Sequence, residues 1–194
     1  MVTEEGKKKQ AALQAEIAKR VAGYKREQEQ LLGELASVGV HIDMVNRLPM
    51  VPTKDYVQAI PILARHLRKT YSEATLESLA RTLATQEAKQ YWDELVEMYR
   101  SNRNRVREGS GDFTMGLAAA VAAACPPGRL DELIELVRDT ELPHRVLLLT
   151  PLRKRRGKDP KIAQLIDELR HDPALAKEIN SWKILSKQAT SRTH

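Results

Sequence analysis

Apolar residues recur every three or four positions along most of the chain, which is the spacing of one face of an amphipathic helix. The first such stretch covers residues 4–36, which contain no proline. Its apolar and semi-apolar positions, with the polar Gln28 among them, are Leu13, Ile17, Val21, Tyr24, Leu31 and Leu35. Because these spacings are close to those of a heptad seam, they predict one long N-terminal helix over residues 1–36. That helix either packs on its own chain or forms a coiled-coil arm for dimerisation or for docking a partner.

Residues 37–54 lack this periodicity, and all nine prolines of the chain lie at position 49 or later. The segment therefore marks a boundary between the long helix and the region that follows. It is nevertheless too apolar for a free linker. Its apolar residues include Val38, Val40, Ile42, Met44 and Val45. We predict a connector that packs against the first helices of the next region.

From residue 55 to residue 185 the chain consists of short helical patterns separated by turns, and residues 186–194 form a polar tail. Two turns, Asp159–Pro160 and Asp172–Pro173, place a capping carboxylate before a proline that suits the first helical position. Pro61 lies inside a pattern and is expected to kink its helix. A later pattern predicts core positions at Val146, Leu149 and Leu152. No segment shows the strict alternation of a strand, so the predicted fold class is all-α.

These patterns are internally related. A shift of 33 residues superposes six positions of the last patterns, including the turn residues Asp139 and Asp172. A shift of 70 residues, two units of 35, superposes five positions of an earlier pair. Each unit predicts a pair of antiparallel helices, and neighbouring pairs must stack because one pair cannot bury its apolar stripe alone.

The clearest units are LDELIELVRDTELPHRVLLLTPL, at residues 130–152, and IAQLIDELRHDPALAKEINSWKIL, at residues 162–185. Both contain two helices, a turn aspartate and a basic residue early in the second helix, Arg145 or Lys177. The pattern resembles the HEAT-repeat family of α-solenoids over residues 55–185. The resemblance implies a right-handed solenoid of about four HEAT-like helix pairs, preceded by the long helix.

In the HEAT family the turn aspartate and the basic residue commonly support stacking between repeats. The resemblance therefore implies structural roles for Asp139, Asp172, Arg145 and Lys177. Most members of the family are scaffolds that bind other proteins, and a minority act on nucleic acids or on small-molecule cofactors. The second unit departs from the family pattern through the inserted loop RSNRNRVREGSGD.

Composition excludes several classes of protein. The chain has 32 Lys and Arg against 26 Asp and Glu, a net charge of +6 that is spread almost evenly, so no segment is a basic domain. One cysteine excludes an intramolecular disulfide framework. The longest uncharged apolar run is too short to span a bilayer, and no apolar leader follows the charged N-terminus. We expect a soluble cytoplasmic protein that does not enter a membrane.

Catalytic and metal-binding motifs are not found. No cysteine–histidine set has zinc-ligand spacing, and Gly109, Ser110 and Gly111 lack the lysine of a phosphate loop. We expect no cofactor and no metal, and the sequence favours a non-enzymatic role without excluding an enzyme. The five histidines are expected at the surface or in turns, and Cys125 is expected to be a small buried side chain. The segment GLAAAVAAAC, ending at Cys125, predicts either tight packing between helices or a shallow apolar groove for a partner helix.

Two basic clusters are the candidate binding residues. The first is a loop with Arg100, Arg103, Arg105 and Arg107. The second follows a later helix and contains Arg153, Lys154, Arg155 and Arg156. The repeat topology puts them on opposite edges, so they do not form one continuous track. Each is either a solvated loop or a site for carboxylates or phosphates.

The leading prediction is a non-enzymatic adaptor or scaffold module that binds another protein through its acidic groups. The alternative is a nucleic-acid-binding HEAT-like protein, similar to the HEAT-like DNA glycosylases that hold a duplex in a basic concave face. Trp92–Asp93 alone is too weak a signal for such a glycosylase. A third hypothesis is a homodimer formed through the N-terminal helix.

Overall fold

The computed structural model describes the backbone of residues 3–107 and 111–190, and the side chains of these residues up to Trp182. Every regular element in these ranges is a helix, which confirms the all-α class. The α-helices are α1 (Glu4–Ser37), α2 (Ile60–His66), α3 (Glu73–Thr82), α4 (Trp92–Ser101), α5 (Phe113–Ala124), α6 (Leu130–Arg138), α7 (Leu149–Arg155), α8 (Pro160–Leu169) and α9 (Pro173–Thr190). Short 3₁₀ helices join them: η1 (Val45–Met50), η2 (Thr53–Asp55), η3 (Val57–Ala59), η4 (Gln86–Tyr91), η5 (Pro127–Arg129) and η6 (Arg145–Leu148).

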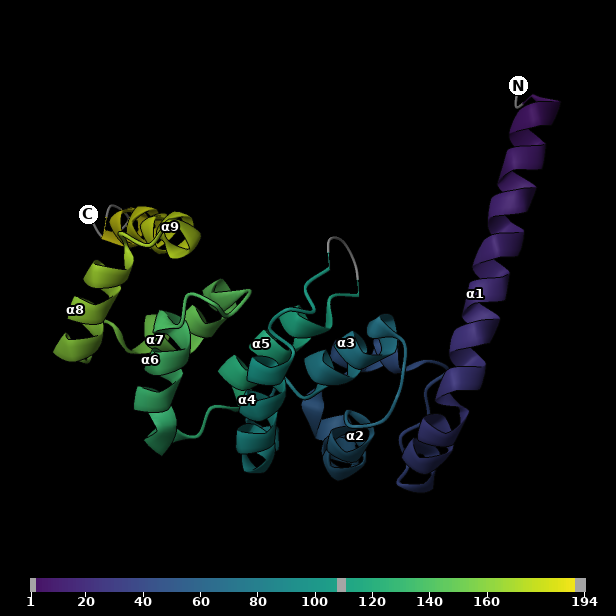
Figure 1. The fold of residues 1–194 in the computed structure, drawn as a ribbon, viewed down its shortest axis with the longest axis horizontal. Coiled ribbons are helices and arrows are strands. Elements are labelled where there is room, and N and C mark those ends of the chain that lie inside the picture. Colours follow the sequence, from purple (N-terminus) through teal and green to yellow (C-terminus); the bar gives the residue numbers. More distant parts are fainter. Residues whose placement is uncertain (1–2, 108–110, 191–194) are drawn as a thin grey trace.

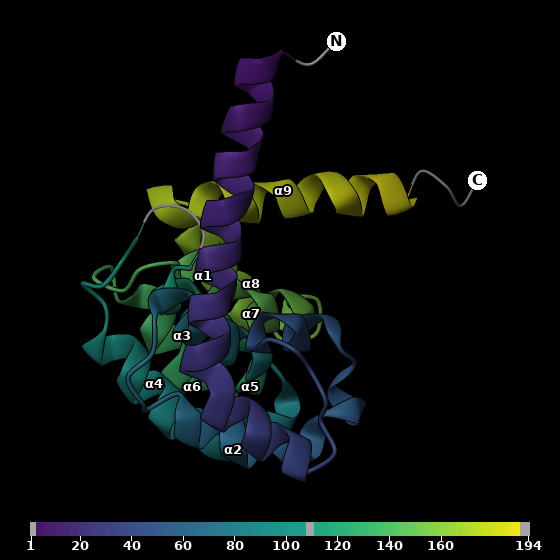
Figure 2. The same ribbon diagram turned by 90° about the vertical axis from the view of Figure 1, so that its right-hand side faces the viewer.

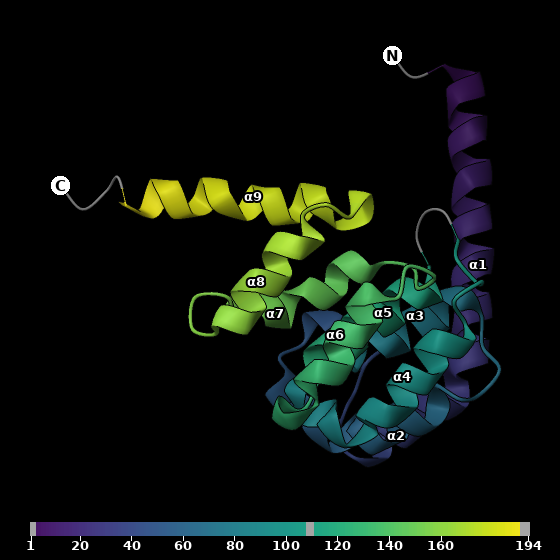
Figure 3. The ribbon, with the colours of Figure 1, turned by 60° about the vertical axis from the view of Figure 1, so that its left-hand side comes forward.

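The helices follow one another in a row, from α1 at one end of the molecule to α8 and α9 at the other (Figure 1). The main contacts join elements that are close in sequence: α3 with α5, α4 with α5, α5 with α7, and α8 with α9. Figure 3 shows α9 lying across the end of the row. Each helix therefore buries its apolar face mainly against its neighbours in the chain, and α1 and α9 form the two ends.

The long helix α1 packs on the other helices only near its C-terminal end. Leu31 and Leu35 are fully buried there. The buried Gln28 side chain donates to Thr75 Oγ1 (2.9 Å) and accepts from the Val45 N–H (2.9 Å). The N-terminal part of α1 stands clear of the other helices (Figures 1 and 2), and Leu13 is 55% exposed. The predicted helix is confirmed, and most of its length is a projecting arm.

The connector packs as predicted. Val40, Val45 and Leu48 are buried, and η1 lies against α3. Val38 and Ile42 are partly buried against the same core. This segment therefore joins the C-terminal end of α1 to the helical row, instead of acting as a linker between independent parts.

Helices α3 and α5 share the most extensive contact in the row. Gly116 in α5 faces α3 so closely that a Cβ atom there would lie 2.9 Å from the Glu77 carbonyl oxygen and 3.0 Å from the Ala80 Cβ. Asp112 caps α5 by accepting from the backbone N–H groups of Thr114 (2.9 Å) and Met115 (3.3 Å). The absence of a side chain at residue 116 is what permits this approach.

Polar contacts join the N-terminal ends of alternate helices along one side of the row. Asp112, at the start of α5, lies 2.8 Å from His144 Nε2, just before η6. Next to His144, the buried Arg145 guanidinium donates to the Val137 carbonyl (2.7 Å) and to the Asp172 carboxylate at the start of α9 (2.7 Å). These contacts fix neighbouring helices relative to one another.

The sequence predictions for two local features are wrong. Pro61 does not kink its helix; it occupies the first turn of α2, where its missing N–H costs no hydrogen bond. Val146 is not a core residue and is 36% exposed. Residues 145–148 form a 3₁₀ helix with about three residues per turn, which brings Leu148 into the core instead.

The helix caps, the residues expected to stack the repeats and the C-terminal tail were also predicted from the sequence. The capping carboxylates of Asp159 and Asp172 are confirmed, since each accepts from the N–H two residues later at 3.0 Å and 2.9 Å. Lys177 is exposed, whereas Arg145 and Asp172 form the expected pair. Of the predicted polar tail at 186–194, the backbone up to Thr190 continues α9, and residues 191–194 lie outside the described part.

Candidate functional site

The four arginines of the first basic cluster do not converge on one site. The Arg105 guanidinium forms an ion pair with Glu73 of α3 and lies 5.5 Å from the centre of the Phe113 ring. Arg100 lines a cavity between α4 and α6 whose walls also include acidic side chains, among them Glu97. Arg103 and Arg107 are exposed, and residues 108–110 of the same loop lie outside the described part. Arg105 thus has a structural contact, and the cavity that Arg100 lines is also lined by carboxylates of the chain.

The second basic cluster divides into two pairs with different surroundings. The guanidinium groups of Arg153 and Arg156 lie 5.3 Å and 5.2 Å from the centre of the Trp182 ring on α9. These contacts are cation–π interactions that hold α9 against α7. Lys154 and Arg155, by contrast, line a cleft between α5 and α7. Only two of the eight predicted residues therefore line a cavity with apolar walls.

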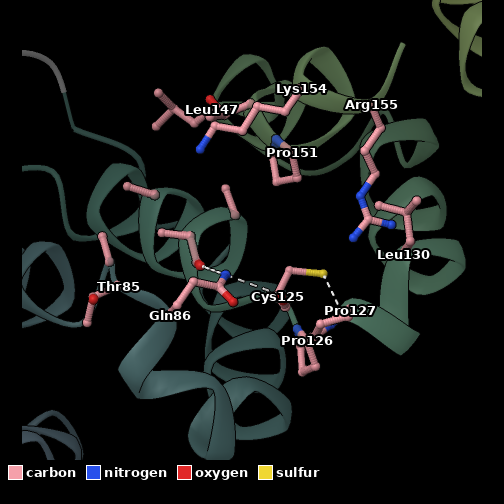
Figure 4. A pocket seen from close by; sticks show the side chains of 15 residues that line it. Thr85, Gln86, Cys125, Pro126, Pro127, Leu130, Leu147, Pro151, Lys154 and Arg155 are labelled. Atoms are coloured by element: carbon pink, nitrogen blue, oxygen red, sulfur yellow. Dashed lines mark hydrogen bonds between the residues drawn. The ribbon is translucent and has the colours of Figure 1, made fainter. Parts of the chain in front are cut away.

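This cleft has a volume of about 610 Å³ (Figure 4). Its floor is the outer face of α5, with Ala119, Ala122 and Ala123. These positions are three and four residues apart, so their methyl groups share one face of the helix and leave a hollow above it. Of the predicted alternatives for the alanine-rich segment, tight packing between helices is confirmed, because Gly116 on another face of α5 packs closely against α3. The groove for a partner helix stays a prediction.

The walls of the cleft come from segments on either side of α5. Pro126, Pro127 and Leu130 form one side, and Leu147 and Pro151 form another. The Gln86 amide donates to the carbonyls of Ala123 and Cys125, two of the carbonyl groups at the C-terminal end of α5. This contact satisfies backbone groups that a helix end leaves without partners, and it fixes the edge of the cleft.

Cys125 lies at the bottom of the cleft, and its predicted burial is confirmed at 8% exposure. The thiol donates weakly towards the carbonyls of Pro126 (3.5 Å) and Arg129 (3.8 Å). Burial raises the pKa of the Cys125 thiol, although Arg155 and Arg129 oppose the shift. The group is therefore a protonated, apolar part of the surface at neutral pH and not an activated nucleophile.

The charge of the cleft is entirely positive. Lys154 and Arg155 are exposed at its rim, and none of the residues that line it is acidic. Neither side chain forms an ion pair with another described residue. An apolar hollow with two cations at its edge fits a ligand that combines an apolar surface with a carboxylate or another anion.

One histidine departs from the expected surface position. His66 is completely buried; its Nδ1 lies 2.6 Å from the Tyr71 hydroxyl and its Nε2 lies 3.0 Å from the Glu34 carboxylate. A neutral ring that accepts at Nδ1 and donates from Nε2 satisfies both contacts. Glu34 belongs to α1, so His66 helps to anchor the long helix. Within the described residues, no group of three His, Cys, Asp or Glu side chains is placed to hold a metal.

We predict that acidification destabilises this anchor. Burial lowers the pKa of His66, against the opposing effect of the Glu34 carboxylate. An unfolded chain therefore binds a proton at this residue at a higher pH than the folded chain does. Stability is complete above the ordinary histidine pKa of 6.5 and falls as the pH drops below it, by at most about 1.4 kcal/mol per pH unit. Urea unfolding at a series of pH values measures this slope.

The controls for the pH prediction are two matched substitutions. His66→Gln removes the titrating group and is expected to flatten the slope between pH 7 and about pH 5. His171→Gln changes an exposed histidine and is expected to leave the slope unchanged. An unaltered slope in His66→Gln would show that other groups dominate this pH range.

Comparisons of the chain with protein-family models, with curated proteins and with solved structures found no match. Among the described helices, none combines the length and the apolar character that crossing a membrane requires. The geometry and charge of the cleft itself are therefore the basis for assigning a function.

Proposed function

We propose that residues 55–185 form a HEAT-like right-handed solenoid of about four helix pairs, and that the chain is an adaptor that binds another protein. The neighbour-to-neighbour contacts along the row support this architecture. So does the Arg145–Asp172 pair, which joins two residues with the sequence positions expected for stacking between such repeats. A cytoplasmic location, expected from the sequence features taken together, belongs to the same proposal.

The cleft between α5 and α7, termed the alanine cleft, is the proposed binding site. Its occupant is an amphipathic helix of the partner that carries an acidic side chain. The observation that carries this proposal is the combination of an apolar floor of Ala119, Ala122 and Ala123 with Lys154 and Arg155 at the rim and no acidic residue in the lining. Alanine methyl groups let a partner helix approach closely, and the two cations complement its carboxylate.

The contacts of the aromatic and basic residues favour a protein over a nucleic acid. Trp92 and Trp182 are buried, and arginine side chains lie over their rings, so neither ring is free to stack on a base. The Arg129 guanidinium that covers Trp92 is paired with Asp93 and Glu132. The alanine floor also offers no polar group to a phosphate backbone.

Selection from a displayed library of amphipathic helices tests the proposal. The library contains helices of equal apolar content whose polar faces are either acidic or basic, and we expect acidic helices to be enriched. Fluorescence anisotropy then measures one enriched peptide. We expect Lys154→Glu/Arg155→Glu and Ala123→Leu each to weaken its binding at least about tenfold, because one reverses the charge of the rim and the other fills the floor.

The control variant is Lys54→Glu/Lys158→Glu, which makes the same change in net charge at exposed residues outside the cleft. We expect it to bind the peptide as the parent chain does. Equal enrichment of acidic and basic helices, or equal losses in both double variants, would contradict the alanine cleft as the site. Labelled duplex and single-stranded DNA, measured over a salt series, provide the competing outcome: tight binding that falls steeply with salt favours the nucleic-acid alternative.

A further inference from the structure

The N-terminal half of α1 carries an apolar stripe that no other described part of the chain covers. Leu13, Ile17 and Val21 belong neither to the core nor to the partly buried residues packed against it. From Gln28 onwards the chain itself covers the stripe, since Gln28 is 3% and Leu31 0% exposed. Any partner is therefore confined to the stripe N-terminal to Gln28. A helix that stands alone in water is marginally stable, so covering this stripe stabilises it.

The uncovered stripe faces the same side of α1 as the part that packs on the row. The Gln28 side chain donates to Thr75 of α3, and Tyr24 lines a small cavity together with both residues. Ile17 and Val21 are three to four residues apart from one another and from Tyr24, so all of these side chains share one face of α1. A partner on the stripe therefore lies beside α1 and next to the α3 end of the row.

The loop between α4 and α5, termed the arginine loop, borders the same side. Its Arg105 forms an ion pair with Glu73 of α3, and the neighbouring Ser72 N–H donates to Glu27 of α1. Gly111, at the other end of the loop, lines the small cavity beside α1. The described ends of the loop rise from the row on the side to which α1 projects (Figures 1 and 3). The arginine loop therefore lies near the edge of α1 that carries Glu27.

Cations flank the uncovered stripe on both of its edges. With 3.6 residues per turn, Lys9, Glu16 and Arg20 fall on the edge nearer the arginine loop. Lys7 and Lys25 fall on the opposite edge. Four cations and one carboxylate therefore border the stripe.

The contacts within the chain leave most of these cations available. Arg103 and Arg107 of the arginine loop are exposed and, like Arg20, form no ion pair with another described residue. Lys7 and Lys9 pair with glutamates one turn away on α1, in exposed contacts that exchange readily. An apolar stripe with unused guanidinium and ammonium groups around it complements a surface that is apolar at its centre and acidic at its edges.

We propose that the corner between the N-terminal half of α1 and the arginine loop, termed the arm corner, binds a helix of another protein whose apolar stripe is flanked by carboxylates. The partner's apolar side chains pack on Leu13, Ile17 and Val21, and its carboxylates accept from the cations on either side. The small cavity of about 230 Å³ is too small for a helix, so the partner lies outside it, along the stripe N-terminal to Tyr24.

Other occupants fit this surface less well. A second copy of the chain brings the same excess of cations to the stripe and repels it. A nucleic acid satisfies the cations and leaves the apolar stripe in water. The arm corner is separate from the alanine cleft, which α5 and α7 form, so this inference adds a second site to the proposed adaptor and does not depend on the first.

Two synthetic peptides test the chemistry of the partner. Both are helices of roughly 20 residues with the same leucine stripe; one carries glutamate and the other lysine beside the stripe. Fluorescence anisotropy measures their binding to the full chain. We expect the acidic peptide to bind at least about tenfold more tightly than the basic one. Equal affinities, or no binding of the acidic peptide, overturn the proposal.

Substitutions on the two sides of the arm corner test the site. We expect Ile17→Glu, which puts a charge into the stripe, to weaken binding of the acidic peptide at least about tenfold. Arg103→Glu/Arg107→Glu, which reverses the charge of the arginine loop, is expected to do the same. None of these three residues belongs to the core, so both variants keep the fold. Unchanged binding in either variant contradicts the arm corner as the site.

Each variant has a control with the same change in net charge. Ala15→Glu alters the exposed side of α1 away from the stripe, and Lys54→Glu/Lys158→Glu alters exposed residues far from the loop in sequence. We expect both controls to bind the acidic peptide as the parent chain does. Losses equal to those of the matched variants would show that net charge alone governs binding, which overturns the proposal.

Three further outcomes assign the surface to another occupant. A loss in Lys154→Glu/Arg155→Glu without a loss in the arm-corner variants places the acidic peptide in the alanine cleft; this overturns the arm corner and leaves the proposed function standing. Sedimentation of the chain alone is expected to give 21.9 kDa, and a dimer that Ile17→Glu abolishes assigns the stripe to a second copy. Duplex DNA that binds more tightly than the acidic peptide assigns the cations to phosphates. Each of these results overturns the proposal.

Discussion

Gly116→Val is expected to destabilise the fold by about 3 kcal/mol, a large part of the stability of a domain of this size. A side chain at residue 116 meets the Glu77 carbonyl oxygen at 2.9 Å, and backbone cannot move aside as the end of a flexible side chain can. Helices α3 and α5 must therefore separate, although they share the most extensive contact in the row. Urea unfolding followed by tryptophan fluorescence measures the loss.

The control for residue 116 is Gly128→Val. Gly128 is exposed, and nothing lies within 4 Å of a Cβ atom built there. We expect its free energy of unfolding to stay within about 0.5 kcal/mol of the parent value, as for most surface substitutions. Similar losses in both variants would show that the α3–α5 contact is looser than the structure indicates.

Local signals in the sequence account for most of the secondary structure. Asp159 and Asp172 act on N–H groups only two residues away, so an Asp–Pro pair before an apolar pattern suffices to predict each cap. The spacing of Leu31 and Leu35 likewise predicts the buried face of α1. Such features depend on neighbours in the chain, and the sequence displays those directly.

Features that depend on distant residues were not predictable in the same way. His66 is buried because Glu34, 32 residues earlier, accepts its hydrogen bond. The second basic cluster separates into two pairs because Arg153 and Arg156 lie over the ring of Trp182 on α9, whereas Lys154 and Arg155 line the cleft. A single sequence does not reveal which of several neighbouring cations will meet an aromatic ring on another helix.

The alanine cleft was predictable only in part. The alanines of α5 indicate a face that permits close approach, which the sequence shows. Whether another helix of the chain fills that space depends on the relative positions of α5 and α7, which residues distant in the sequence determine. The sequence thus predicts the small side chains that form the floor of the cleft. It does not predict whether another helix of the chain covers them.

Arg145→Ala is expected to reduce the free energy of unfolding by about 3 kcal/mol. The guanidinium is only 6% exposed, and its loss leaves the Val137 carbonyl and the Asp172 carboxylate without their donor. Asp172 still caps α9 through the Ala174 N–H, so helix α9 is expected to form and to pack less firmly on its neighbour. Chemical unfolding measures the loss.

Arg138→Ala is the matched control for this second large effect, because Arg138 joins α6 to Glu168 of α8 through an ion pair whose side chains are both about half exposed. Exposed pairs contribute little, so we expect the free energy of unfolding to fall by less than about 0.5 kcal/mol.

An NMR titration of the Asp172 carboxyl adds a second readout. The hydrogen bond from Arg145 lowers the pKa of Asp172, so this pKa should rise towards the ordinary aspartate value in Arg145→Ala. A pKa that does not move, together with equal losses in the two variants, would mean that burial of Arg145 contributes nothing beyond an ordinary surface contact. The expected difference between the two arginines instead makes one buried guanidinium the main polar connection between the last two helix pairs.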